Sequence, residues 1–160
     1  MQGGLWLAGL SMDSEAAELM ALENYAGERV TFGVDSGAAV TVVTKDTASD
    51  YPRQAGAGKR MTDCQGNVVK DMGEKDLQLT TASGGIKFAR VTVAPVAKNF
   101  LAASSLLASG HEVVFKKEDS YILHRGSGRK QVLAQHNGVF EVTYALTPYA
   151  SRAVPPRRTL

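Results

Sequence analysis

Short runs of apolar and β-branched residues alternate with turn residues over most of this chain. The turns pair glycine with Asp, Ser, Gln or Asn, as in Asn137-Gly138. The apolar runs cover residues 30–34, 39–43, 67–70, 75–81, 86–94, 111–116, 120–124, 130–134 and 138–144. Many short strands at this spacing predict an all-β barrel or sandwich.

Two segments have helical rather than strand character. Residues 14–24 are rich in Ala, Leu, Met and Glu, with Ser14 placed to cap a helix, which predicts an N-terminal helix that ends before Gly27. Residues 102–109 carry Ala and Leu at helical spacing and are followed by Gly110, which predicts a short helix near the C-terminal side of the core. Residues 49–59 are expected to form a loop.

Composition excludes several classes of function. The 160 residues are 44% hydrophobic and 21% charged with a net charge of +2, which is typical of one globular domain without an electrostatic footprint for nucleic acid. The three histidines match no metal motif, and the chain contains no run of about 20 apolar residues that would span a membrane. A single cysteine rules out an internal disulfide and a cysteine-based zinc site, which favours a reducing, intracellular compartment.

One carboxylate interrupts the most apolar stretch, VTFGVDSGAAVTVV. Asp35 follows Val34 and precedes Ser36-Gly37, and no Lys or Arg lies between Arg29 and Lys45. An Asp-Ser-Gly between two strands is often only a turn, because its side chains bond to nearby backbone amides. A carboxylate with apolar flanks is costly unless its charge is compensated, so either the turn reaches water or the carboxylate meets a special partner.

The segment VDSGAAVTVV resembles the active-site signature of retropepsin-like aspartic proteases. The stretch VTVAPVAKNFLAASSLLASGHEVVF, residues 91–115, is similar to the segment that closes this domain in copia-type retrotransposon gag-pol polyproteins. The resemblance implies a retropepsin-like closed β-barrel over residues 28–110. The predicted helix makes residues 1–27 a partly helical N-terminal extension, and the alternation of strands and turns over 111–147 predicts a C-terminal β-meander extension. Residues 148–160 are polar and contain proline, which predicts a flexible tail.

The same resemblance implies roles for eight residues. Asp35, Ser36 and Gly37 would form the catalytic loop, Ala38, Gly66 and Gly73 would contact substrate, and Leu101 and Ala102 would support the active-site loop. Two departures from the family keep a second interpretation open. Ala102 stands where the family usually has glycine, and the flap region is poor in glycine. The alternative is therefore a catalytically inactive retropepsin-like module for peptide binding or dimerisation.

An aspartic protease needs two neighbouring carboxylates that share a proton, so that one acts as base and the other as acid. The chain has only one Asp-Ser-Gly and no internal repeat, so the second aspartate must come from a second copy, in a homodimer. The expected substrate is an extended polypeptide such as its own precursor polyprotein, cleaved in the cytoplasm or within a retrotransposon particle. No metal or organic cofactor is expected. A third interpretation is that the resemblance is accidental and the chain is an unrelated β-barrel.

Overall fold

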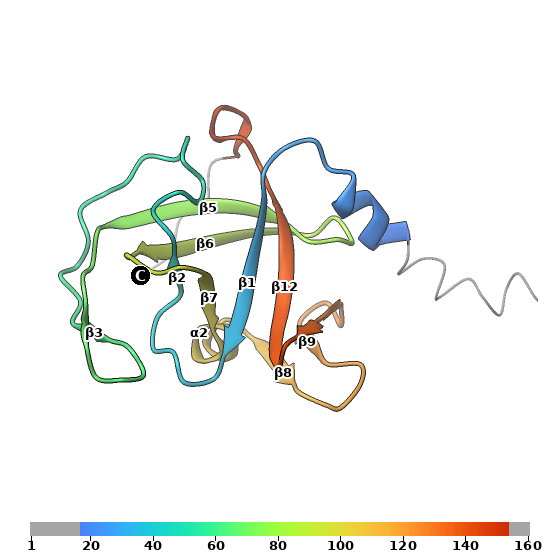
Figure 1. The fold of residues 1–160 in the computed structure, drawn as a ribbon. Coiled ribbons are helices and arrows are strands. Elements are labelled where there is room, and N and C mark those ends of the chain that lie inside the picture. Colours follow the sequence, from blue (N-terminus) through green and yellow to red (C-terminus); the bar gives the residue numbers. More distant parts are fainter. Residues whose placement is uncertain (1–16, 154–160) are drawn as a thin grey trace, which may run out of the picture.

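A closed barrel of six strands forms the centre of the computed structural model, which describes residues 17–153 (Figure 1). Around the barrel the strands follow the order β1 (Arg29–Asp35), β7 (Asn99–Ala102), β2 (Val42–Val43), β6 (Ile86–Val93), β5 (Glu74–Thr80) and β12 (Val139–Leu146). The pairing of β12 with β1 closes the ring. The expectation of a mostly β structure with few helices is confirmed.

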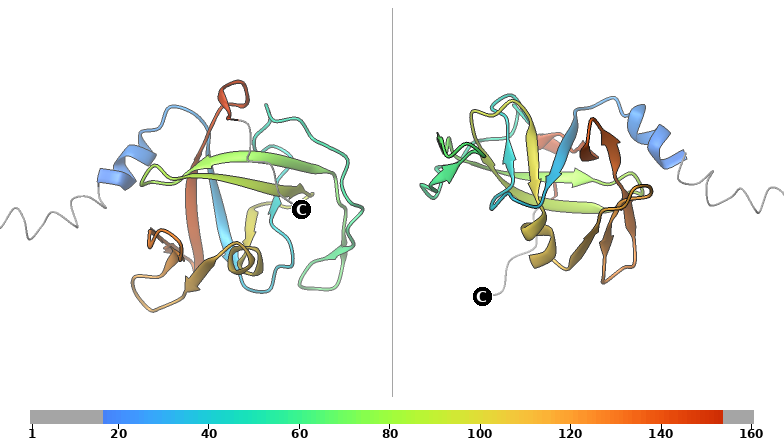
Figure 2. Two further views of the ribbon diagram at one scale, coloured as in Figure 1. Left: turned by 180° about the vertical axis from the view of Figure 1, so that it is seen from behind. Right: turned by 60° about the horizontal axis from the view of Figure 1, so that its bottom comes forward.

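The remaining elements lie around this barrel. Strand β11 (Ala134–His136) pairs with β12, and β8 (His111–Val114), β9 (Tyr121–His124) and β10 (Lys130–Val132) form a separate antiparallel sheet. Strands β3 (Met61–Thr62) and β4 (Val68–Val69) form a hairpin. Figure 2 shows this hairpin and the sheet β8–β10 on opposite sides of the barrel, with helix α2 (Ala103–Ala108) next to the sheet. A 3-10 turn, η1 (Tyr149–Ser151), follows β12.

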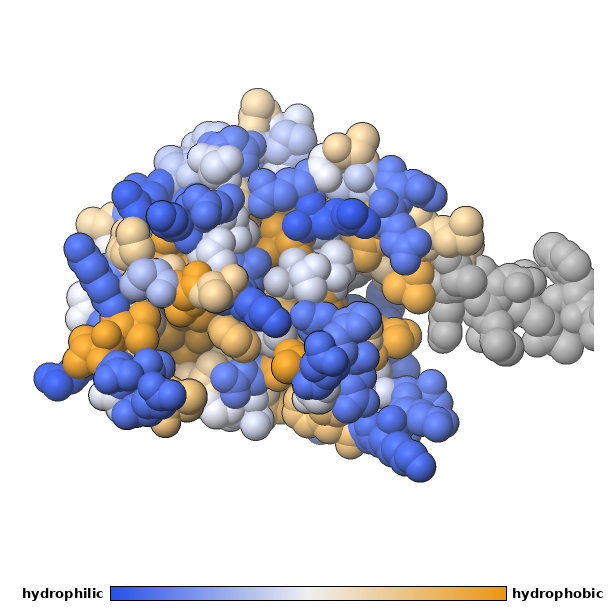
Figure 3. Space-filling model, in the orientation of Figure 1, coloured by the Kyte–Doolittle hydropathy of each residue, from blue (hydrophilic) through white to orange (hydrophobic). Residues whose placement is uncertain are grey.

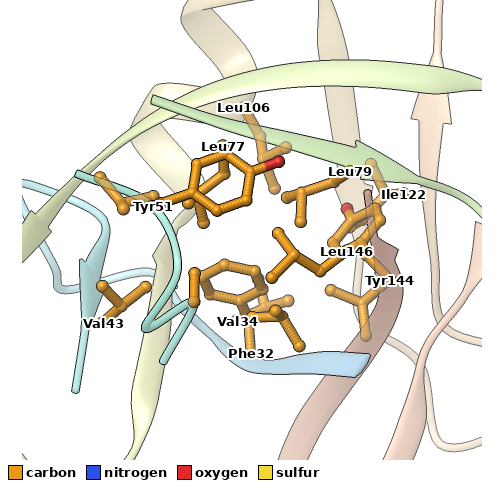
Figure 4. Close-up of a cluster of buried hydrophobic side chains, with 14 of the residues drawn as sticks. Phe32, Val34, Val43, Tyr51, Leu77, Leu79, Leu106, Ile122, Tyr144 and Leu146 are labelled. Carbon is orange, nitrogen blue, oxygen red and sulfur yellow. The ribbon is translucent and has the colours of Figure 1, made fainter. Parts of the chain in front are cut away.

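Alternating side chains from the barrel strands fill a continuous core (Figure 4). Strand β1 points Val30, Phe32 and Val34 inward, and β12 points Val142, Tyr144 and Leu146 toward them. The rings of Phe32 and Tyr144 meet edge to face at 6.0 Å between their centroids. Each such buried side chain contributes about 1.5–3 kcal/mol, so the barrel interior is the main source of stability.

Both predicted helices lie close to their expected positions. Helix α2 covers residues 103–108 of the predicted 102–109, and Gly110 follows it with a φ of +84° while its N–H donates to the Leu107 carbonyl at 3.3 Å. Residues 17–23 of the predicted segment 14–24 are helical, and residues 14–16 lie outside the described range. The predicted strand 39–43 is shorter than expected, because residues 36–41 form the loop after β1 and only Val42–Val43 pair.

Two of the expected boundaries require correction. The expected core of 28–110 lacks β12, although β12 pairs with both β1 and β5 and belongs to the barrel. Of the strands in the expected C-terminal extension, 111–147, only β8–β10 and β11 therefore lie outside the barrel. Residues 148–153 were assigned to a flexible tail but are docked on the barrel, because the Tyr149 ring packs 5.3 Å from that of Tyr51 and the Ala153 N–H donates to Gln78 Oε1 at 2.6 Å. Residues 1–16 and 154–160 lie outside the described part of the chain. Within the described part, no helix has the length and apolar character needed to cross a membrane.

Candidate active site

Asp35 is the last residue of β1 and begins the loop that leads to β2. Its Oδ1 accepts a hydrogen bond from the Gly37 N–H at 2.8 Å, which closes a turn of the kind that Asp side chains favour. The Asp35 side chain is half-buried, whereas Ser36 and Gly37 are exposed. A Cβ at Gly37 would touch Asp35 Oδ1 at 3.4 Å, so glycine leaves the space beside the carboxylate open.

Strand β7 supports this loop from the neighbouring position in the barrel. It runs parallel to β1, with Leu101 opposite Val34 and Ala102 opposite Asp35. Ala102 is completely buried, and its N–H donates to Thr41 Oγ1 at 3.1 Å. Because interiors are close-packed, a small residue suits this buried position, and the support role of Ala102 for an active-site loop stays a prediction.

Helix α2 begins directly after Ala102 and reaches the other side of the loop. The Ser104 hydroxyl donates to the Ala38 carbonyl at 3.4 Å. The helix therefore holds the loop at Ala38, while Thr41 connects the loop to β7 through the Ala102 N–H. These contacts fix the backbone on the C-terminal side of Ser36 and Gly37, and the pairing of Asp35 with Ala102 fixes it on the N-terminal side.

Asn99, at the start of β7, joins three segments. Its Oδ1 accepts hydrogen bonds from the Thr44 N–H at 2.9 Å and the Thr47 hydroxyl at 3.0 Å, and its Nδ2 donates to the Thr31 carbonyl at 3.2 Å. The roles of Asn99, Thr41 and Ser104 were not predicted from the sequence. A signal was present for Thr41, because a hydroxyl inside an apolar run needs a hydrogen-bond partner once it is buried.

The β3–β4 hairpin contains Gly66 in its turn, with a φ of +83°. Asp63 Oδ1 organises this turn by accepting hydrogen bonds from the Gln65 and Asn67 N–H groups, both at 2.9 Å, and the bonds from Asn67 are the main cause of the lowered pKa of Asp63. Val68 on β4 is 67% exposed. In Figure 1 the hairpin lies at the left of the molecule, on the same side of the barrel as the loop after β1. Figure 3 shows apolar side chains at the surface of this left side.

Gly73 lies apart from this hairpin, directly before β5. It is buried with a φ of +118°, its N–H donates to Asp71 Oδ1 at 2.9 Å, and a Cβ there would lie 2.5 Å from the Gln54 carbonyl oxygen. Glycine is therefore needed for the close approach of two chain segments. The structure brings together residues 35–38 with Leu101 and Ala102, places Gly66 in the nearby hairpin, and leaves Gly73 in a structural position.

The charge of Asp35 has no counterion within one copy of the described chain. Asp35 forms no ion pair with any of residues 17–153. Among the same residues, no three His, Cys, Asp or Glu side chains gather in a way that would hold a metal ion. What the site offers is a half-exposed carboxylate on a loop that strand β7 and helix α2 hold in place. Comparison of the chain with protein-family models, with curated proteins and with solved structures gave no match.

Proposed function

We propose that the chain is an aspartic endopeptidase that acts as a homodimer, with Asp35 from each copy at one shared site. The observation that carries this proposal is the setting of Asp35. Its carboxylate ends a barrel strand, is half exposed, accepts one hydrogen bond from Gly37, and has no ion pair among the described residues. A second carboxylate across a two-fold axis would complete the site.

The chemistry follows from two carboxylates held close together. Two adjacent negative charges repel, so the pair retains one proton and holds one carboxylate and one carboxylic acid. The carboxylate takes a proton from a water molecule as the water oxygen attacks the peptide carbonyl carbon, and the acid protonates the carbonyl oxygen. The resulting tetrahedral diol collapses when its C–N bond breaks. The amine nitrogen takes up a proton from the pair, and one diol hydroxyl returns its proton to the pair as the carboxylic acid product forms.

The surroundings of Asp35 support contact with a second copy. Ser36 and Gly37 are exposed at the tip of the loop, where a partner loop can reach them. Leu107 lies one turn after Ser104 on α2 and is 59% exposed. Because Ser104 contacts the loop, Leu107 presents an apolar surface on the same face of the helix.

An extended polypeptide is the substrate class that we propose. A peptide in β conformation pairs its backbone with strands and offers alternate side chains to pockets. The β3–β4 hairpin, with the exposed Val68, is the element placed to cover such a peptide. Processing of a precursor polyprotein is the corresponding biological role, by the resemblance to copia-type proteases.

A non-catalytic peptide-binding or dimerisation module is the second candidate. Two departures from the protease pattern favour it. The hairpin has Gly66 as its one glycine between Met61 and Val69, and Ala102 stands where the family usually has glycine. Such a module would keep the two-fold contact and bind peptide without hydrolysing it.

A cleavage assay distinguishes these candidates. Wild-type protein is incubated with a peptide library from about pH 4 to 7 over a range of protein concentrations, beside Asp35→Asn. The matched control is Asp119→Asn, in the second Asp-Ser pair, where a φ of +60° suits Asn as well as Asp. We expect cleavage by the wild type and by Asp119→Asn that falls steeply on dilution, and none by Asp35→Asn. Full activity of Asp35→Asn would refute the proposal, and a dimer that binds peptide without cleaving it would favour the second candidate.

A further inference from the structure

A cavity of about 650 Å³ lies away from Asp35, between the barrel, helix α2 and the sheet β8–β10. Its walls include Leu79, Leu101 and Leu106, and polar groups reach it from β6, β8, β9 and β10. Small-molecule sites in proteins usually have volumes of about 300–1,000 Å³ and mostly apolar walls with a few placed polar groups. The cavity matches that description in size and lining.

Lys87 on β6 breaks the hydrophobic pattern at this cavity. The order Ile-Lys-Phe-Ala would place Ile86 and Phe88 inside, yet these two residues are 59% and 41% exposed and meet the cavity only as lining residues that stay open to solvent. Lys87 shares the inner face with Ala89 and Val91, which belong to or pack against the core. Val91 and Val93 are almost fully buried and set this register for the whole strand. An inward lysine on a barrel strand is costly unless a partner compensates it.

No such partner for Lys87 is present within residues 17–153. Lys75 is the other inward lysine, on β5, and its ammonium donates to the Thr47 and Ala48 carbonyls at 3.1 and 2.8 Å. Lys87, in contrast, contacts only the ring of His111, through Nε2, and burial lowers the pKa of its ammonium. It forms no ion pair with any described residue.

Hydrogen bonds fix the direction of the Lys87–His111 contact. The Ser109 hydroxyl donates to the Leu106 carbonyl at 3.0 Å, so its oxygen accepts the proton of His111 Nδ1 at 2.9 Å. His111 Nε2 then carries the lone pair, which accepts one N–H of the Lys87 ammonium. Burial and the positive charge of Lys87 both lower the pKa of His111, which keeps the ring neutral. Two N–H groups of Lys87 remain for a ligand.

Further polar groups line the same cavity. His124 Nδ1 accepts the Ser127 N–H at 3.2 Å, and the His124 ring lies 4.9 Å from that of His111. Arg129 also reaches the cavity and forms no ion pair within the described range. No Asp or Glu is among the described residues that line the cavity.

We propose that this cavity binds a small organic carboxylate with an apolar body. The carboxylate would lie at Lys87, whose two free N–H groups match its two oxygens, and the apolar body would pack against Leu79, Leu101 and Leu106. Lys87 and Arg129 line the cavity without an ion pair to any described residue, and no described Asp or Glu lines it, so the cavity favours an anionic ligand. This inference rests on residues other than Asp35, so it stands or falls independently of proteolysis.

Binding of octanoate to the full chain tests the proposal, with octanol as the neutral probe of the same length. We expect octanoate to bind the wild type at neutral pH more tightly than octanol. Lys87→Met should weaken octanoate binding by about tenfold or more while octanol binding is unchanged. Lys98→Met, at an exposed lysine, is the matched control and should bind like the wild type. Equal octanoate affinity for the wild type and Lys87→Met, equal affinity of the wild type for the two probes, or no octanoate binding at millimolar concentration would each overturn the proposal.

A second measurement needs no variant. Octanoate labelled at its carboxyl carbon is titrated by NMR while bound to wild-type protein. We expect the pKa of the bound carboxyl group to lie below that of free octanoate, because the Lys87 ammonium stabilises the anion. An unchanged or raised pKa of the bound probe would contradict the assignment of Lys87 as the carboxylate partner.

Discussion

Removal of β12 should prevent the barrel from folding, although the strand lies outside the expected core of residues 28–110. The perturbation is a chain that ends at Gly110, which removes β12 together with the outer strands β8 to β11. In the structure β12 buries Val142, Tyr144 and Leu146, which contribute roughly 5–9 kcal/mol together. Small domains are stable by about 5–15 kcal/mol in total, so this loss is comparable with the whole free energy of unfolding. The backbone of β1 from Arg29 to Gly33 would also lose its antiparallel partner.

Urea unfolding followed by circular dichroism tests this directly. A chain of residues 17–153 should unfold in one cooperative transition, and a chain of residues 17–110 should show none. A chain of residues 17–110 that unfolds cooperatively at the same urea midpoint would refute the assignment of β12 as the closing strand.

A point substitution within β12 makes the same test without shortening the chain. Tyr144→Ala removes a buried ring that packs on Phe32 and should lower the free energy of unfolding by roughly 3–5 kcal/mol. Thr143→Ala, on the outer face with its hydroxyl 2.8 Å from that of Thr31, should cost about 1 kcal/mol or less. Equal losses for the two variants would show that the register of β12 is wrong.

Three further predictions follow from particular contacts. Leu107→Glu should weaken the proposed homodimer by about 10- to 100-fold in sedimentation equilibrium, because an exposed apolar side chain near the Ser104 contact would be replaced by a charge. Asn99→Leu should lower the free energy of unfolding in urea by about 1–3 kcal/mol, because the buried partners of its amide, including the Thr44 N–H, lose their hydrogen bonds. The pKa of His111 is lower in the folded chain than in the unfolded chain, so the unfolded chain binds the proton first as pH falls. The melting temperature should therefore fall as pH drops below about 6.5, and this fall should be smaller in His111→Gln.

Local patterns were sufficient to predict most strands and both helices. Each of these elements depends on neighbouring residues, as in the apolar alternation of β1 or the glycine that follows α2. The pairing of β12 with β1 joins residues from opposite ends of the described chain, and no local pattern specifies which distant strand closes a barrel. For the same reason the tail residues around Tyr149 were expected to fray, whereas Tyr51 provides a surface on which they dock.

The candidate sites differ in how far the sequence could predict them. Asp35 was visible because a carboxylate in an apolar run is unusual, whereas the register that sets Ala102 opposite Asp35 depends on the pairing of two strands distant in the sequence. The cavity at Lys87 was invisible, because the pattern of β6 favours Ile86 inside and only the burial of Val91 reveals the opposite register. A conflict between local pattern and observed register is often a mark of a functional position.

The central claim, that one site is built from two Asp35 carboxylates, is tested most directly with two copies of the chain joined by a flexible linker. Three tethered proteins are compared for peptide cleavage at concentrations where activity no longer depends on dilution: both halves wild type, one half Asp35→Asn, and both halves Asp35→Asn. The account predicts that the mixed protein is as inactive as the one with two substitutions, because each site needs both carboxylates. Retention of about half the activity by the mixed protein would contradict it, because each copy would then carry a complete site of its own.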